Sequence, residues 1–324
     1  SQAVTRENET ARENEENDMS SQQEGEQEKN GNEEEQQERK TDENEPQTTE
    51  NAGTATAQLP AWTTAVESTP KIDLSMERLS DFHYLLNNFF VVDPNTTVDG
   101  SQINASTFLG DSLTLEEDSS VPQILIYHTH SQEAFKDSGP QGRTIVEVGD
   151  YLAELLTQKG YRVYHDTSVY DLQSGVLDRS KAYNYALEGV NRILQQNPSI
   201  QVVLDLHRDG VSENLHMVSD INGKPTAQIM FFNGLSRTPE GKIAYLSNPY
   251  LAENLAFSLK MQLGAQAYFP GFARKIYLKG LRYNLHLRPK SALIEAGAQT
   301  NTFEEVKNAM EPLAQLLDMV LQGE

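Results

Sequence analysis

Short apolar runs alternate with stretches of helical periodicity from about residue 121 to the end of the chain. Ile124, Leu125 and Ile126 are consecutive apolar residues after Pro122, and this pattern predicts a short buried strand over 123–127. The same criteria predict strands at 161–164, 200–206 and 292–294, helices at 144–159, 179–196, 250–263 and 303–322, and the two arms of a hairpin at 214–219 and 226–232. Such alternation is typical of an α/β fold, so we expect a mostly parallel twisted sheet with helices on both faces.

The segment before this alternation has a different pattern. Apolar side chains recur at helical spacing over 74–90, and Asp93-Pro94 favours a helix end there. We therefore expect residues 71–120 to form a helical lead-in that packs on a catalytic domain spanning residues 121–324.

Residues 1–50 contain no Leu, Ile, Phe, Tyr or Trp, and they hold 17 acidic and 5 basic residues, a net charge of -12. A segment of this composition buries too little apolar surface to offset the entropy of ordering the chain. We expect residues 1–70 to be a disordered acidic linker, with a solvated spacer favoured over a binding tail.

The whole chain of 324 residues has a formal net charge of -22 and no cysteine. Bulk electrostatics therefore disfavour nucleic acid and anionic lipid as partners. The lack of cysteine excludes a thiol nucleophile, a Cys-ligated zinc and disulfides. No apolar run is long enough to span a membrane, and no signal peptide is visible. The chain opens at Ser1 without Met, so we expect an upstream segment to have been removed.

Three predicted strands end in residues that can do chemistry. The first is followed by His128, His130 and Glu133, the second ends at His207, and the third ends at Glu295. Carboxyl ends of parallel strands share one edge of a sheet, so these residues should be neighbours. Two imidazoles and one carboxylate form a three-ligand zinc set with an open fourth position, and a further carboxylate can move a proton.

Each residue also has a simpler interpretation. A single His128 or His207 is more often a hydrogen-bonded histidine at a strand end than a ligand. Glu295 is harder to explain in this way, because an unpaired carboxylate after an apolar strand is costly. Ser131 and Ser212 are poor candidates for a nucleophile, since neither lies in a Gly-x-Ser-x-Gly elbow.

Three motifs also carry a family resemblance. The segments Ile-Leu-Ile-Tyr-His-Thr-His-Ser-Gln-Glu-Ala-Phe (124–135), Val-Val-Leu-Asp-Leu-His-Arg-Asp-Gly (202–210) and Leu-Ile-Glu-Ala-Gly-Ala-Gln-Thr-Asn (293–301) resemble the stage II sporulation protein P family. The resemblance covers roughly residues 72–324, and the motifs are specific when taken together. The family is related to the zinc-dependent N-acetylmuramoyl-L-alanine amidases.

The resemblance implies a membrane-anchored peptidoglycan hydrolase that cleaves the amide between N-acetylmuramic acid and L-Ala during septal wall remodelling and engulfment in sporulation. Cross-link endopeptidase activity is also attributed to the family. The implied partner is stage II sporulation protein D, a lytic transglycosylase. The implied location is extracytoplasmic, on the mother-cell membrane facing the septal wall. The implied anchor is a transmembrane helix upstream of this soluble portion.

The resemblance also assigns the Zn²⁺ ligands. Alignment with the wider amidases places the first ligand at His130 and not His128, and it places another at His207. Glu133 and Glu147 compete for the carboxylate position, and Glu133 is favoured because the family's own motif contains it.

Glu295 matches the catalytic glutamate of the family. His128, Arg208 and Asn284 are assigned as substrate contacts or as residues that orient a ligand. Two other functions remain open, namely a carboxypeptidase-like zinc peptidase acting on stem peptides and a wall-binding module without catalysis.

Overall fold

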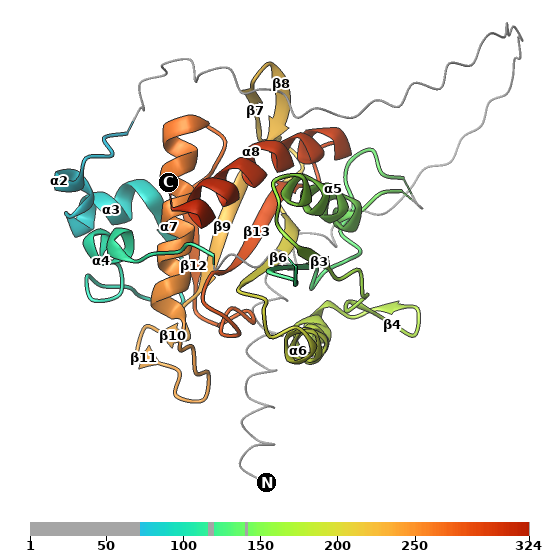
Figure 1. The fold of residues 1–324 in the computed structure, drawn as a ribbon, viewed down its shortest axis with the longest axis horizontal. Helices are drawn as coiled ribbons and strands as arrows, with labels where there is room; N and C mark the ends of the chain where they lie inside the picture. Colours follow the sequence, from blue (N-terminus) through green and yellow to red (C-terminus); the bar gives the residue numbers. More distant parts are fainter. Residues whose placement is uncertain (1–71, 116–119, 140–141, 324) are drawn as a thin grey trace, which may run out of the picture. The chain divides into compact units, whose positions relative to one another are not determined.

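The computed structural model describes residues 72–115, 120–139 and 142–323, and its main sheet has seven strands in the order β1-β12-β9-β13-β6-β2-β3 (Figure 1). Every neighbouring pair in this sheet is parallel except β13 and β9, so the predicted mostly parallel sheet is confirmed. The predicted acidic linker, residues 1–70, lies outside the described residues. The strands are β1 (Phe90–Val92), β2 (Ile124–Tyr127), β3 (Val163–His165), β6 (Val202–Asp209), β9 (Ile229–Gly234), β12 (Ile276–Lys279) and β13 (Ser291–Ala298).

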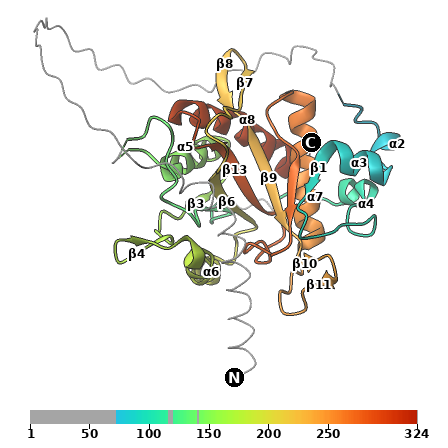
Figure 2. The ribbon, with the colours of Figure 1, turned by 180° about the vertical axis from the view of Figure 1, so that it is seen from behind.

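Four long helices cover the two faces of the sheet. They are α5 (Ile145–Gln158), α6 (Arg179–Gln196), α7 (Leu251–Tyr268) and α8 (Phe303–Gln322). Helices α5, α7 and α8 share the larger apolar core with one face, and α8 crosses in front of β9 and β13 in Figure 1 but behind them in Figure 2. Helix α6 packs on the other face, where Ala186, Val190 and Ile193 meet Leu125 and Val203. The prediction of helices on both faces is therefore confirmed.

Local sequence explains where these helices begin. The side chain of Thr144 caps α5 in a capping box with Glu147, and Asp178 caps α6 by accepting a hydrogen bond from the backbone of Lys181. Helix α6 ends at the residue before Asn197-Pro198, as predicted.

The lead-in differs from its prediction. The single helix expected over 74–90 is two short helices, α2 (Met76–Leu79) and α3 (Phe82–Phe89), because Asp81 caps a new helix through the backbone of Tyr84. The chain then extends directly into β1, which joins the main sheet beside β12. One further helix, α4 (Ala105–Gly110), completes the lead-in, and the described residues form one compact unit.

Three small hairpins extend from this core. The predicted turn at Asn222-Gly223 joins β7 (Val218–Ile221) to β8 (Lys224–Ala227), with φ of 56° and 77° at the two turn residues. The predicted second arm is wrong beyond Ala227, because the chain leaves the hairpin there and enters the main sheet as β9. The other hairpins pair β4 (Leu172–Gln173) with β5 (Val176–Leu177), and β10 (Arg237–Thr238) with β11 (Gly241–Lys242). Within the described residues, no helix has the length and apolar character needed to cross a bilayer.

Candidate active site

Three neighbouring strands, β2, β6 and β13, bring the sequence-predicted residues together at one edge. Glu295 on β13 lies in register beside His207 on β6. The ring of His130, in the turn after β2, lies 5.2 Å from the ring of His207, centroid to centroid and nearly perpendicular. His207 and Glu295 face α6, because alternate residues of a strand share a face of the sheet. His130 reaches the same side from the turn, where its ring meets Tyr183 of α6.

Glu133 joins this cluster, whereas Glu147 does not. Glu133 Oε2 accepts a hydrogen bond from the backbone N–H of Arg208 at 2.8 Å and lies 3.8 Å from His207 Nδ1. Its Oε1 accepts a hydrogen bond from Arg179 at 2.6 Å. Glu147 is exposed, and its carboxylate accepts hydrogen bonds from Thr144 in the α5 capping box.

Asp205 contacts the Nε2 side of the His207 ring, opposite the side that faces Glu133. His207 Nε2 lies 2.8 Å from Asp205 Oδ1, which is an ion-pair distance although the two groups are not aligned as a hydrogen bond. The Asp205 carboxylate also accepts hydrogen bonds from the backbone and the hydroxyl of Thr129 at 2.9 and 2.6 Å. Nδ1 of His207 is therefore the nitrogen directed at Glu133. A carboxylate that orients an imidazole in this way is the usual companion of a metal-binding histidine.

The charges around His207 shift its pKa. Burial lowers the pKa of His207, but the charge of Asp205, aided by Glu133 and Glu295, outweighs it and raises the pKa to about 9. In the opposite sense, burial raises the pKa of Asp205, but His207 and Thr129 hold it below its usual value. The positive charge of His207 thus balances the buried carboxylates around it.

Glu295 also has a displaced pKa. Burial, followed by the charge of Asp209, raises the pKa of Glu295 to about 8, although His207 opposes the shift. Its Oε2 atom is buried and has no hydrogen-bond partner among the described residues. A carboxyl group that titrates near neutral pH can both accept and return a proton.

Helix α6 supplies two residues that the sequence did not indicate. The ring of Tyr183 stacks on His207 at 6.4 Å and meets His130 edge-on at 5.5 Å. Arg179, in the first turn of α6, forms the ion pair with Glu133. Asp205 was also missed, yet its position two residues before His207 on a predicted strand places both on one face.

His128 lies on the opposite face, against α5. Its Nδ1 donates to the carbonyl of Leu206 at 2.8 Å, and its Nε2 lies 2.9 Å from Nε2 of His165. His165 Nδ1 in turn donates to Asp150 at 2.9 Å. Both ring nitrogens of each imidazole therefore have a partner. Gly149 makes room, since a Cβ there would lie 2.6 Å from His128 Nε2.

The two other predicted substrate contacts, Arg208 and Asn284, form hydrogen bonds within the protein. The Arg208 side chain donates from Nε to the carbonyl of Ala134 at 2.9 Å and from Nη1 to its neighbour Asp209 at 3.2 Å. Asn284 is buried and donates to the carbonyl of Tyr183 at 2.9 Å. These bonds position β6 and α6 around the cluster, and they leave the assignment of both residues as substrate contacts a prediction.

The side chains of the cluster are of the types that bind zinc. Nδ1 of His130 is buried and has no partner among the described residues, and the same holds for Glu295 Oε2. Such orphaned atoms are costly unless a further group satisfies them. As they stand, no three His, Asp or Glu side chains of the described ranges are arranged to hold a metal. Arg179 contacts one oxygen of the Glu133 carboxylate.

Comparison with known proteins identifies the family to which this chain belongs. The sequence profile of Stage II sporulation protein P (SpoIIP) matches residues 1–318. The chain belongs to this family. A curated relative, Stage II sporulation protein P of Bacillus subtilis (strain 168), is 23% identical over 210 residues, which is 59% of this chain and 49% of the relative. The chain therefore spans about half the length of the curated relative that it matches.

Solved structures of amidases are similar to this chain at a lower level. The CwlD amidase of Clostridioides difficile, solved in complex with the GerS lipoprotein, aligns with a TM-score of 0.38 at 14% identity over 62% of this chain and 95% of its own. The N-acetylmuramyl-L-alanine amidase Ami1 of Mycobacterium smegmatis aligns with a TM-score of 0.38 at 11% identity over 64% of this chain and 100% of its own.

Proposed function

We infer that this chain is a zinc-dependent peptidoglycan hydrolase that cleaves the amide between N-acetylmuramic acid and the L-Ala of the stem peptide. The observation that supports this function is the buried cluster of His130, Glu133, His207 and Glu295 at one sheet edge, in a member of a sporulation protein family. The pKa of Glu295, about 8, suits a proton carrier, and His130, Glu133 and His207 would form a zinc ligand set.

His130, Glu133 and His207 would hold the zinc ion. When bound, zinc supplies Lewis-acid chemistry that polarises an amide carbonyl and acidifies water. Asp205 fixes the ring of His207, so that Nδ1 is the nitrogen offered to the ion. Tyr183 covers the two imidazoles from the side of α6 and excludes bulk water from them.

Glu295 moves the proton. Its pKa of about 8 means that it exchanges a proton readily near neutral pH. It accepts the proton of the attacking water and then donates it to the nitrogen of the leaving L-Ala. One carboxyl group can perform both steps because the two proton transfers follow each other at the same place.

The biological setting is part of the same proposal. Family membership supports a role in septal wall remodelling and engulfment during sporulation, with the chain outside the cytoplasm and anchored to the mother-cell membrane through an upstream segment. Cross-link endopeptidase activity and a partnership with stage II sporulation protein D belong to the proposal as well.

Hydrolysis of purified sacculi by the zinc-loaded chain tests the function. We expect Glu295→Gln to slow release of stem peptides by about 10²–10⁴-fold, the usual contribution of general acid–base catalysis. Glu304→Gln is the matched control, because Glu304 is exposed on α8 and should not affect turnover. Native turnover by Glu295→Gln would contradict the mechanism.

Mass spectrometry of the products separates the alternatives. The proposed cleavage yields intact stem peptides with a free amine on L-Ala and glycan strands without peptides. Release of free amino acids would instead indicate a carboxypeptidase-like enzyme. Binding to sacculi without any product would indicate a wall-binding module.

A further inference from the structure

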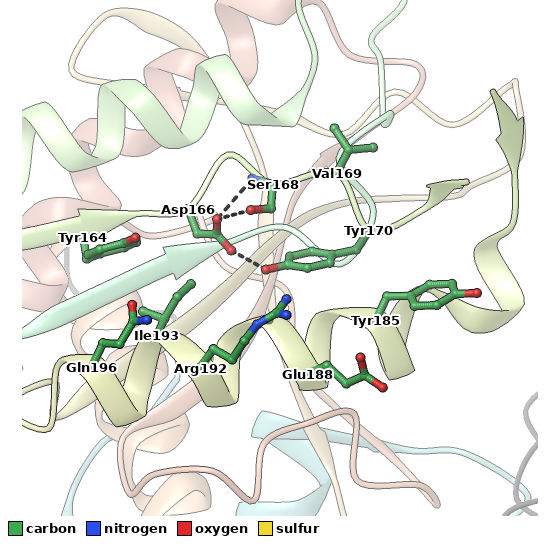
Figure 3. A pocket seen from close by; sticks show the side chains of 11 residues that line it. Tyr164, Asp166, Ser168, Val169, Tyr170, Tyr185, Glu188, Arg192, Ile193 and Gln196 are labelled. Carbon is green, nitrogen blue, oxygen red and sulfur yellow. Dashed lines mark hydrogen bonds between the residues drawn. The ribbon is translucent and has the colours of Figure 1, made fainter. Parts of the chain in front are cut away.

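A second site lies on the flank of α6 that faces away from the candidate active site. It is an open groove with a volume of about 450 Å³ between α6 and the segment that follows β3 (Figure 3). A volume of 300–1,000 Å³ is typical of ligand sites. The side chains that can reach a ligand are those of Tyr164, Ser168, Tyr185, Glu188, Arg192 and Gln196.

The floor of the groove is fixed. The buried carboxylate of Asp166 accepts hydrogen bonds from the backbone and hydroxyl of Ser168 at 3.1 and 2.6 Å and from the hydroxyl of Tyr170 at 2.5 Å. The Tyr170 hydroxyl lies against α6 at Gly189, where a Cβ would come within 2.2 Å of it. Both carboxylate oxygens of Asp166 therefore already accept hydrogen bonds from the protein, and a ligand must be recognised by the side chains along the walls of the groove.

The walls combine two aromatic rings with two free charges of opposite sign. Figure 3 shows Tyr164 at one end, beside Gln196, and Tyr185 at the other end, beside Glu188. Glu188 and Arg192 are exposed and one helical turn apart, and neither has a hydrogen bond or ion pair with another described residue. Their charges cancel each other, and the carboxylate of Asp166 on the floor adds a negative charge, so the groove does not favour a polyanion.

These walls suit a neutral sugar chain. The faces of the two tyrosines offer platforms for pyranose rings, and the side chains of Glu188 and Arg192 offer an acceptor and donors for hydroxyl and acetamido groups. Tyr185 and Gln196 are eleven residues apart on α6, which corresponds to ~16 Å at 1.5 Å per residue. That length accommodates about three pyranose rings.

We propose that this groove binds the glycan strand of peptidoglycan, as a segment of N-acetylated amino sugars. The inference rests on the proposed function for the identity of the polymer. Helix α6 links the two sites, because Arg179 and Tyr183 reach the candidate active site while Glu188 and Arg192 lie on the other flank. Glycan binding would hold the chain on the wall while the stem peptide enters the active site.

Titration with the tetramer of N-acetylglucosamine, followed by calorimetry, tests the groove without any catalysis. We expect Arg192→Ala and Tyr164→Ala to weaken binding at least tenfold, and Gln196→Ala to weaken it about threefold. Gln195→Ala is the matched control, because Gln195 is the exposed neighbour of Gln196 and does not line the groove. Lack of binding by the wild-type chain, or equal binding by all four variants, would overturn the proposal.

A second assay separates this proposal from the function itself. A monomeric muropeptide is too short to fill both sites, so Arg192→Ala should cleave it at the native rate but should digest intact sacculi at least threefold more slowly. Cleavage of the muropeptide by a wild-type chain that does not bind the tetramer would refute the groove alone. Tetramer binding without cleavage would refute the hydrolase alone and support the groove.

Discussion

Two histidines that lie two residues apart in one motif have opposite environments. His128 faces α5, and both of its ring nitrogens have partners, in Leu206 and His165. His130 faces α6, and its Nδ1 is buried without a partner among the described residues. A buried imidazole with both nitrogens satisfied stabilises the fold, whereas one with an orphaned nitrogen is prepared for a ligand. The difference shows that burial alone does not separate a structural histidine from a functional one.

The largest effect on zinc binding and stability is expected when each of the two histidines is replaced by alanine in turn. His130→Ala should weaken zinc binding by more than about 100-fold, because replacing even a residue that only hydrogen-bonds to a metal ligand costs about 10–100-fold. The variant should have near-native stability, because the substitution removes a buried group that has no hydrogen-bond partner among the described residues. His128→Ala should retain zinc but lose about 2 kcal/mol or more, since it leaves buried groups unpaired at ~1–3 kcal/mol each. Zinc titration and urea denaturation of both variants measure the two effects. The reverse pattern would assign the ligand to His128.

A smaller effect on stability is expected at Gly149, which packs against the ring of His128. Gly149→Ala should destabilise the fold by ~1–3 kcal/mol, because its Cβ would lie 2.6 Å from His128 and 2.7 Å from His165. Gly110→Ala is the control, because a Cβ at Gly110 meets nothing within 4 Å. Thermal unfolding of both variants is the measurement. If Gly149→Ala were as stable as Gly110→Ala, the contact between the two imidazoles would not be tightly packed.

The smallest expected effect is on zinc affinity and comes from replacing Arg179, which pairs with Glu133 near His130. Arg179→Ala should raise zinc affinity about tenfold, because the ion pair with Glu133 competes for a ligand oxygen and tenfold corresponds to 1.4 kcal/mol. Lys181→Ala is the control, since Lys181 is an exposed cation in the same turn that pairs only with Asp178 among the described residues. Competition with a chromogenic zinc chelator gives both affinities. A lower affinity for Arg179→Ala would show that the arginine instead holds Glu133 in place.

Much of the fold could be predicted from the sequence because its signals are local. The bounds of α6 agree with the predicted 179–196, since Asp178 and Asn197-Pro198 mark its two ends. Strands β1 and β12 were missed, because each is short and is stabilised by pairing with strands distant in sequence. The antiparallel pairing of β9 with β13 is likewise a property of the assembled sheet.

The sequence by itself determined that His207 and Glu295 belong to buried strands, and that a motif with two histidines and a glutamate follows β2. The prediction that both residues end their strands is wrong, because β6 continues to Asp209 and β13 to Ala298. Only the tertiary structure decided that Glu133 and not Glu147 lies beside His207, and that Asp205, Tyr183 and Arg179 complete the cluster. The physical reason is the range of the interactions. Strand alternation fixes which face a residue takes, so His128 continues the face of Ile126, but that rule stops where the chain turns before His130. Beyond that point, the direction of each side chain depends on partners from distant strands and from α6.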